Sequence, residues 1–116
     1  MAGVGGDAGY VEVRTAAASR EEADAITAAL LGSRLAACVQ VLGPVHSRYR
    51  WKGNVESAQE WLCVAKTAAS RAADVMAEIA RVHSYETPEI VVTPILSGSP
   101  SYLAWIDAEV TDPGDE

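Results

Sequence analysis

The stretch that decides the fold is residues 45–67, VHSRYRWKGNVESAQEWLCVAKT, in which a polar turn separates two extended runs. Lys52, Gly53 and Asn54 form a turn signal of the kind that joins antiparallel strands. The first arm begins upstream at Leu35, so each arm has ten or more residues and, at about 3.3 Å per residue, is more than roughly 30 Å long. A compact domain of about 100 residues has a radius of gyration of only about 13 Å. The sequence therefore predicts a hairpin that extends beyond the body of the domain.

This hairpin carries large aromatic side chains that it cannot bury alone. They are Tyr49, Trp51 and Trp61. An uncovered apolar edge promotes aggregation unless something shields it. A second copy of the same chain would provide that cover, so the sequence predicts a homo-oligomer held together by contacts between sheets.

The rest of the chain supplies further strands and helices around the hairpin. Residues 10–16 alternate between two kinds of side chain, which predicts a strand with one buried face. Ser19 and Glu22 have the spacing of a capping box, at the start of a helix that ends near Gly32. The other elements expected are a strand over Leu35–Val45 that bends at Gly43-Pro44 and resumes over His46–Trp51, a strand over Val55–Thr67, a helix capped by Ser70, a strand over Ile90–Leu96 and a last helix that begins at Ser99-Pro100.

The order β-α-β-β-α-β followed by a helix predicts an α+β fold of the ferredoxin-like type. Such a fold has an antiparallel sheet with its helices on one face. We expect a single domain over residues 10–111. The glycine-rich residues 1–9 are expected to form a flexible tail, and residues 112–116 an acidic one.

The composition excludes several classes of protein. The 116 residues include 9 Lys and Arg against 16 Asp and Glu, a net charge of −7, which argues against binding to nucleic acid or to an anionic membrane. No apolar run approaches the roughly 18 residues that a membrane helix needs, and the N-terminus lacks an export signal, so we expect a cytoplasmic protein. No nucleophile elbow or phosphate-binding loop accompanies the two histidines, so we expect no enzyme.

Several segments resemble the CutA-type divalent-cation tolerance proteins over about residues 11–110. The matching segments are Arg34-Leu35-Ala36-Ala37-Cys38-Val39, Tyr49-Arg50-Trp51-Lys52-Gly53, Val55-Glu56, Lys66-Thr67, His83-Ser84-Tyr85-Glu86-Thr87-Pro88-Glu89-Ile90, Pro94-Ile95, and Gly98 followed by Tyr102-Leu103-Ala104-Trp105-Ile106. The resemblance implies a homotrimer of ferredoxin-like subunits, similar to PII signalling proteins, with hairpins packed across subunits. It also implies a role in tolerance to divalent metals, copper above all.

The resemblance also suggests where a metal would bind. The family's metal positions are a cysteine on the first strand and a histidine before the tyrosine loop, and here these positions hold Thr15 and His83. Without the soft thiolate, Cu(I) is less favoured than Cu(II) or another divalent cation. His83 and Glu86 are the candidate metal ligands, with Glu89 nearby. The alternative is a histidine at a helix end whose neighbouring carboxylates only cap or pair.

A second group of residues is expected to line a ligand cleft between subunits. It comprises Lys66, Glu60, Tyr85 and Glu89. Lys66 ends a strand that looks buried, so it either meets an anionic ligand or forms a salt bridge with Glu60 on the same face. Cys38 and Cys63 are expected to be small buried apolar residues rather than a metal pair.

Three hypotheses about function follow. The first is a trimeric metal-tolerance protein with ligand-binding clefts between subunits. The second is a PII-like signalling module that binds a small anionic metabolite, although the tight hairpin turn leaves no long loop for a partner. The third is a structural trimer in which metal binding is incidental.

Overall fold

A computed structural model describes residues 9–110 of the chain. The elements in this range are β1 (Tyr10–Ala17), α1 (Arg20–Gly32), β2 (Cys38–Trp51), β3 (Asn54–Ala68), the 3₁₀ turn η1 (Ala69–Arg71), α2 (Ala72–Val82), β4 (Ile90–Pro94) and α3 (Pro100–Glu109). The tails predicted for residues 1–9 and 112–116 fall outside the described residues, apart from Gly9.

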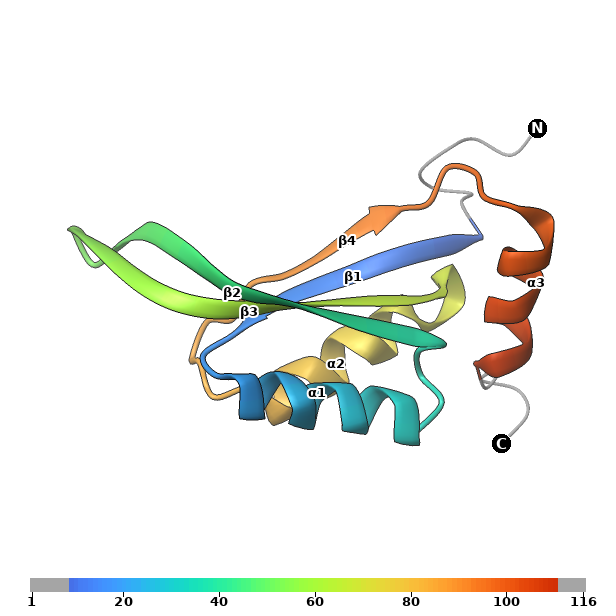
Figure 1. Ribbon diagram of the computed structural model, residues 1–116, viewed down its shortest axis with the longest axis horizontal. Coiled ribbons are helices and arrows are strands. Elements are labelled where there is room, and N and C mark those ends of the chain that lie inside the picture. Colours follow the sequence, from blue (N-terminus) through green and yellow to red (C-terminus); the bar gives the residue numbers. More distant parts are fainter. Residues whose placement is uncertain (1–8, 111–116) are drawn as a thin grey trace.

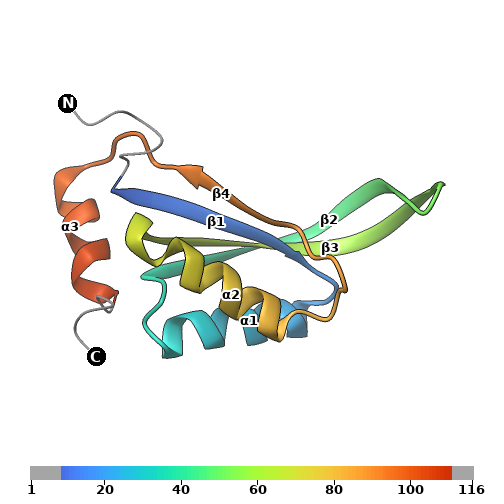
Figure 2. The same ribbon diagram turned by 180° about the vertical axis from the view of Figure 1, so that it is seen from behind.

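The strands form one antiparallel sheet in the order β2-β3-β1-β4. α1 and α2 cover the same face of this sheet, and α3 lies at the end away from the hairpin tip (Figure 1). In the view from behind, α1 and α2 again lie below the sheet, and no helix of residues 9–110 lies above it (Figure 2). This architecture confirms the predicted α+β, ferredoxin-like fold with a C-terminal helix.

The core lies between the sheet and the helices α1 and α2. Alternate residues of β1 and β3 point into it, as the period of two in β1 predicts. Its buried members include Val11, Val13 and Ala17 of β1, Cys63 and Ala65 of β3, Ala23, Ile26 and Leu30 of α1, and Val75 and Ile79 of α2. Ile106 of α3 is also fully buried.

The start of α1 confirms the capping residues, with one difference. Ser19 Oγ accepts a hydrogen bond of 3.0 Å from the backbone N–H of Glu22. The Glu22 carboxylate accepts a bond of 2.8 Å from the N–H of Ala18, one residue before the cap itself. The other carboxylate oxygen is therefore left to reach a different part of the chain.

The predicted cap of α2 is wrong. Ser70 lies inside η1, and the residue before α2 is Arg71, which makes no capping bond with its side chain. Because β3 leads directly into the 3₁₀ turn, the hydroxyl of Ser70 does not precede the helix. Instead Arg71 Nη1 donates to Asp74 Oδ2 over 2.9 Å in the first turn.

The β2–β3 hairpin projects from the body, as predicted. Trp51 pairs with Asn54, so the turn consists of Lys52 and Gly53, both with positive φ (51° and 85°). Such a turn matches the twist of the strands that it joins. The described chain measures 45 × 30 × 22 Å and has a radius of gyration of 15.0 Å. The excess over the roughly 13 Å of a compact domain reflects the projecting arm (Figure 1).

The first arm starts later than predicted, at Cys38. Leu35 and Ala36 donate their N–H groups to Leu30 O, so this segment closes the end of α1. Between Leu42 and Val45 the register with β3 shifts. A side chain at Gly43 would place its Cβ 2.5 Å from Trp61 Cδ1, so the indole ring packs directly on the backbone there.

The aromatic residues of the hairpin differ in exposure. Tyr49 and Trp51 are 43% and 42% exposed, in agreement with the prediction that they need a cover. Trp61, which we also expected at a subunit contact, is half-buried and packs against the core of its own chain. Within residues 9–110, no helix has the length and apolar character needed to cross a membrane.

Candidate functional site

A pocket of about 620 Å³ lies where the hairpin leaves the body of the domain. Residues of β1, β2, β3 and the loop between α2 and β4 line it. We call it the hairpin-base pocket, and its lining residues are Ala16, Ser47, Arg48, Tyr49, Trp51, Glu60, Tyr85, Glu86, Thr87 and Glu89. Three of these residues are carboxylates and one is a guanidinium, so the lining is acidic.

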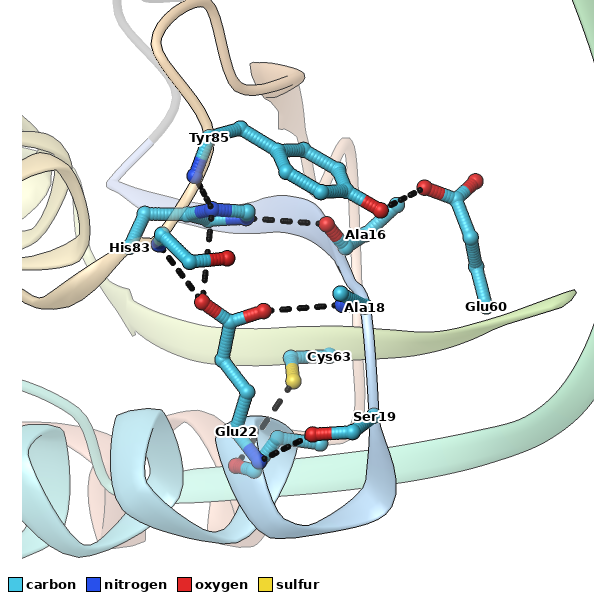
Figure 3. A network of polar contacts seen from close by, with 10 residues as sticks. Ala16, Ala18, Ser19, Glu22, Glu60, Cys63, His83 and Tyr85 are labelled. Atoms are coloured by element: carbon cyan, nitrogen blue, oxygen red, sulfur yellow. Dashed lines mark hydrogen bonds and ion pairs between the residues drawn. The ribbon is translucent and has the colours of Figure 1, made fainter. Parts of the chain in front are cut away.

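Glu60 is the most buried charged residue of this lining. It lies on β3 opposite Val45 and is only 7% exposed. Its Oε2 accepts a hydrogen bond of 2.9 Å from the hydroxyl of Tyr85 (Figure 3). Burial, followed by this bond to Glu60, raises the pKa of Tyr85, so the phenol remains protonated and able to donate. Among residues 9–110 Glu60 has no cationic partner.

His83 holds the loop that carries Tyr85 against β1. Its side chain is fully buried. Nε2 lies 2.8 Å from Ala16 O, and Nδ1 accepts a bond of 3.1 Å from the N–H of Tyr85. This pattern fits the tautomer protonated on Nε2. Neither ring nitrogen then has a lone pair free for a metal ion.

Glu22 ties the same loop to α1. Its Oε2 accepts a bond of 2.6 Å from the N–H of Ser84 and lies 3.7 Å from His83 Nδ1 (Figure 3). Burial alone would raise the pKa of Glu22, but the bonds from Ala18 and Ser84 outweigh it, so the pKa is lowered. The carboxylate is therefore ionised and links three segments of the chain.

The structure brings most of the predicted cleft residues together. Glu60, Tyr85 and Glu89 line the hairpin-base pocket, and so does Glu86. Glu89 is also paired with Arg14 Nε over 3.1 Å. Residues 9–110 contain no group of three or more His, Cys, Asp or Glu side chains arranged to hold a metal. A single chain thus gathers the acidic residues without forming a complete metal site from them.

Lys66 lies elsewhere. It pairs across the sheet with Glu12 and Cys38, and its Nζ is 5.7 Å from the centroid of the Tyr102 ring. No salt bridge joins it to Glu60 within the described chain, because six residues of strand separate the two by about 20 Å.

Thr15 and the cysteines lie away from the pocket. The Thr15 side chain is fully buried on the helix-covered face, opposite Cys63, and its hydroxyl has no hydrogen-bond partner. Cys63 is buried as predicted, and burial raises the pKa of its thiol to about 11. Cys38 is only half-buried, which is less than predicted.

From the sequence, no role at the site was predicted for Arg48 or for Glu22, and Glu22 was expected only to cap a helix. Arg48 lines the pocket from β2, where charged residues alternate along an exposed arm and give no distinguishing signal. Glu22 could have been noticed, since a capping glutamate has two oxygens and the cap uses only one of them.

The fold and the pocket define a ferredoxin-like protein with an acidic pocket at the base of a projecting hairpin. A family model described as "CutA1 divalent ion tolerance protein" matches residues 11–109. The chain belongs to this family.

Relatives in distant organisms agree with this assignment. The divalent-cation tolerance protein CutA of Archaeoglobus fulgidus is 42% identical over 94 residues, which cover 81% of this chain and 91% of the relative. That of Thermus thermophilus is 40% identical and covers 76% of this chain and 85% of the relative. The solved structure of the Archaeoglobus protein, described as periplasmic, matches with a TM-score of 0.85 and 38% identity, over 88% of this chain and 99% of that one.

Proposed function

We propose that this chain acts in divalent-cation tolerance as a homotrimer, with one hairpin-base pocket per subunit that binds Cu(II) or another divalent cation. The observation that carries the proposal is the acidic lining of the pocket. The lining contains the carboxylates of Glu60, Glu86 and Glu89 and one guanidinium, that of Arg48, and only Glu89 is paired with a further guanidinium, that of Arg14. Carboxylate oxygens favour Cu(II) and other divalent cations over Cu(I), and neither cysteine contributes to the lining.

The same charges disfavour the PII-like alternative. A small anionic metabolite would meet three carboxylates in the pocket. The cationic residue expected for it, Lys66, lies beside Tyr102. The geometry therefore supports a cation as the ligand.

Two features support assembly into a trimer. Tyr49 and Trp51 project, half-exposed, from the hairpin, and the sheet face without helices adds Leu42 and Val91, 50% and 38% exposed. Sheet contacts between copies would cover the parts of these side chains that face away from the pocket and bring a neighbouring subunit next to it. Ligands contributed by that neighbour could complete a metal site that one chain leaves incomplete.

The location in the cell is part of the proposal. Cys38 and Cys63 are both unpaired, as is usual in a reducing compartment such as the cytoplasm. The description of the Archaeoglobus relative as periplasmic applies to that protein.

Calorimetric titration of the purified oligomer with Cu(II) and Zn(II), with a weak competing chelator present, tests the proposal. We expect saturable binding of one ion per subunit, weakened at least tenfold by Glu60→Gln, which retains an acceptor for Tyr85. Glu21→Gln removes the same charge from an exposed position on α1 and should change nothing. Weak, non-saturating heats that Glu60→Gln leaves unaltered would refute cation binding in this pocket.

The same titration separates ligand from positioning roles for His83 and Glu86. Glu86 lines the pocket and has no hydrogen-bond or ion-pair partner within residues 9–110, so Glu86→Gln should weaken binding directly. Both ring nitrogens of His83 are engaged within the chain, so we assign it a positioning role. His83→Gln should therefore lower stability, and a loss of metal affinity at unchanged stability would instead make His83 a ligand.

A further inference from the structure

We infer that the hairpin-base pocket also accepts an organic dication, an aliphatic diamine in its diammonium form. This inference rests on the proposed function, because it concerns the same acidic pocket, and it names a class of ligand other than a metal ion. It follows from the size of the pocket, the nature of its walls and the unmatched charges within it.

The size of the pocket suits a small organic molecule. Its volume of about 620 Å³ lies within the range of roughly 300–1,000 Å³ that is typical of small-molecule sites. A bare metal ion needs a tight cage of several donors, and residues 9–110 of one chain provide no such group, so a metal ion would need further ligands from the neighbouring subunit. An extended aliphatic cation can fill this space and reach more than one carboxylate.

The walls combine aromatic rings with carboxylates. Tyr49, Trp51 and Tyr85 all line the pocket alongside the three glutamates. Aromatic faces attract ammonium groups, and Trp51 already does so within this chain, since Lys52 Nζ lies 5.7 Å from its ring centroid. The methylene stem of a diamine would contact the same rings through apolar surface.

Glu60 provides a position for one ammonium group. It is more than nine-tenths buried, and within residues 9–110 it accepts one hydrogen bond, from Tyr85, and forms no ion pair. A buried carboxylate without a counter-ion is costly, so a cation in the pocket is favoured there. Figure 3 shows the Glu60 carboxylate directed toward the Tyr85 hydroxyl. The hydrogen bond between them would hold the carboxylate in place beside the ligand.

Glu86 provides a position for the second ammonium group. Glu89 already has Arg14 as its partner, whereas Glu86 is exposed and unpaired within the described residues. Glu60 lies on β3 and Glu86 on the loop before β4, so the two acids approach the pocket from different elements. A ligand with one charge can satisfy only one of them, and a diammonium compound can satisfy both.

The test uses three probes of similar length: 1,4-diaminobutane, butylamine and the neutral 1-butanol. Each is titrated calorimetrically into the oligomer with EDTA present, so that metal binding plays no part. We expect the diamine to bind at one site per subunit, butylamine at least tenfold more weakly, and butanol not at all. A sedimentation experiment on each variant named below checks that it retains the size of the wild type.

Two isosteric variants separate the two contacts. Glu60→Gln should weaken both amines at least tenfold, whereas Glu86→Gln should weaken the diamine severalfold and leave butylamine unchanged. Glu21→Gln, at an exposed position outside the pocket lining, is the charge-matched control. Equal affinities for the diamine and butylamine, or a diamine affinity that neither pocket variant alters, would overturn the inference.

The metal and amine experiments fail independently. Binding of Cu(II) without binding of the diamine would refute the inference and leave the proposed function intact. Binding of the diamine in EDTA without saturable metal binding would support the inference and refute the metal ligand of the proposed function. The absence of both would overturn both.

Discussion

Glu22 provides a quantitative test of how the pocket loop is held. Replacing it with alanine removes two backbone hydrogen bonds to a carboxylate whose side chain is only 12% exposed, from Ala18 over 2.8 Å and from Ser84 over 2.6 Å. Hydrogen bonds to charged groups contribute about 1.5–3 kcal/mol each. Ala18 and Ser84 are exposed, so water can bond to their N–H groups when the carboxylate is removed, and we therefore take the lower value for both bonds. The expected loss of unfolding free energy is about 3 kcal/mol.

Glu21→Ala is the matched control. Glu21 lies in the same first turn of α1, where it shares the favourable interaction with the helix dipole, but it is exposed. Its replacement should cost less than about 0.5 kcal/mol, as is usual at surface positions. Urea unfolding followed by circular dichroism, at one protein concentration because the chain is proposed to assemble, gives both values. Equal losses for Glu22→Ala and Glu21→Ala would refute the reasoning.

The dependence on pH provides an independent check. Because the pKa of Glu22 is lowered in the folded protein, its contribution to stability is fully present above the ordinary value of 4.5 and is lost as the pH falls through the lower folded value. The difference in stability between the wild type and Glu22→Ala should therefore be largest near neutral pH and shrink below about pH 4. A difference that is constant down to about pH 3 would contradict the lowered pKa.

Three further test substitutions, two of them with a matched control, concern other parts of the structure. Trp51→Asp should convert the proposed trimer into smaller species in sedimentation experiments, because it would bury an unpaired charge between subunits. Leu31→Asp, at a similarly exposed position on α1, should leave the trimer intact. A full-size Trp51→Asp trimer would show that the hairpin lies elsewhere in the assembly. Gly43→Ala should destabilise by about 1–3 kcal/mol because the new methyl group meets an indole ring, whereas Gly32→Ala, with nothing within 4 Å, should stabilise by about 0.5–1 kcal/mol. Urea unfolding measures both, and the same sign for the two would contradict the packing described. Thr15→Val should stabilise by about 1 kcal/mol in the same assay, because it removes a buried hydroxyl without a partner, and a loss would mean that the hydroxyl is satisfied.

The fold was largely predictable because its signals are local. The alternation in β1, the serine and glutamate at the start of α1 and the tight turn of the hairpin each depend on neighbouring residues. Prediction failed where a neighbouring element intervened. Ser70 has the chemistry of a helix cap, but the strand before it continues directly into a 3₁₀ turn and leaves it inside the turn.

The site was predictable only in part. Tyr85, Glu86 and Glu89 are close in the sequence, and a tyrosine loop of this composition is recognisable. The role of His83 was not predictable, because its main partner is the backbone oxygen of Ala16. The type of a residue gives no sign that its backbone oxygen will bond to a distant side chain. Lys66 had the sign and burial expected of a cleft residue, but the direction of the strand carries it to the opposite end of the sheet.

The central place of β1 in the sheet affects how the protein can be made. The ribosome releases β1 first, yet one edge of this strand pairs with β3 and the other with β4, the last strand of the sheet. The β2–β3 hairpin can close once β3 has emerged, and β1 can then pair with β3, whereas the other edge of β1 has no partner until β4 has been synthesised. Pairings between such distant segments slow folding. The newly made chain therefore carries one unpaired edge of β1 until synthesis of the domain is almost complete, and this edge stays accessible to a chaperone until β4 pairs with it.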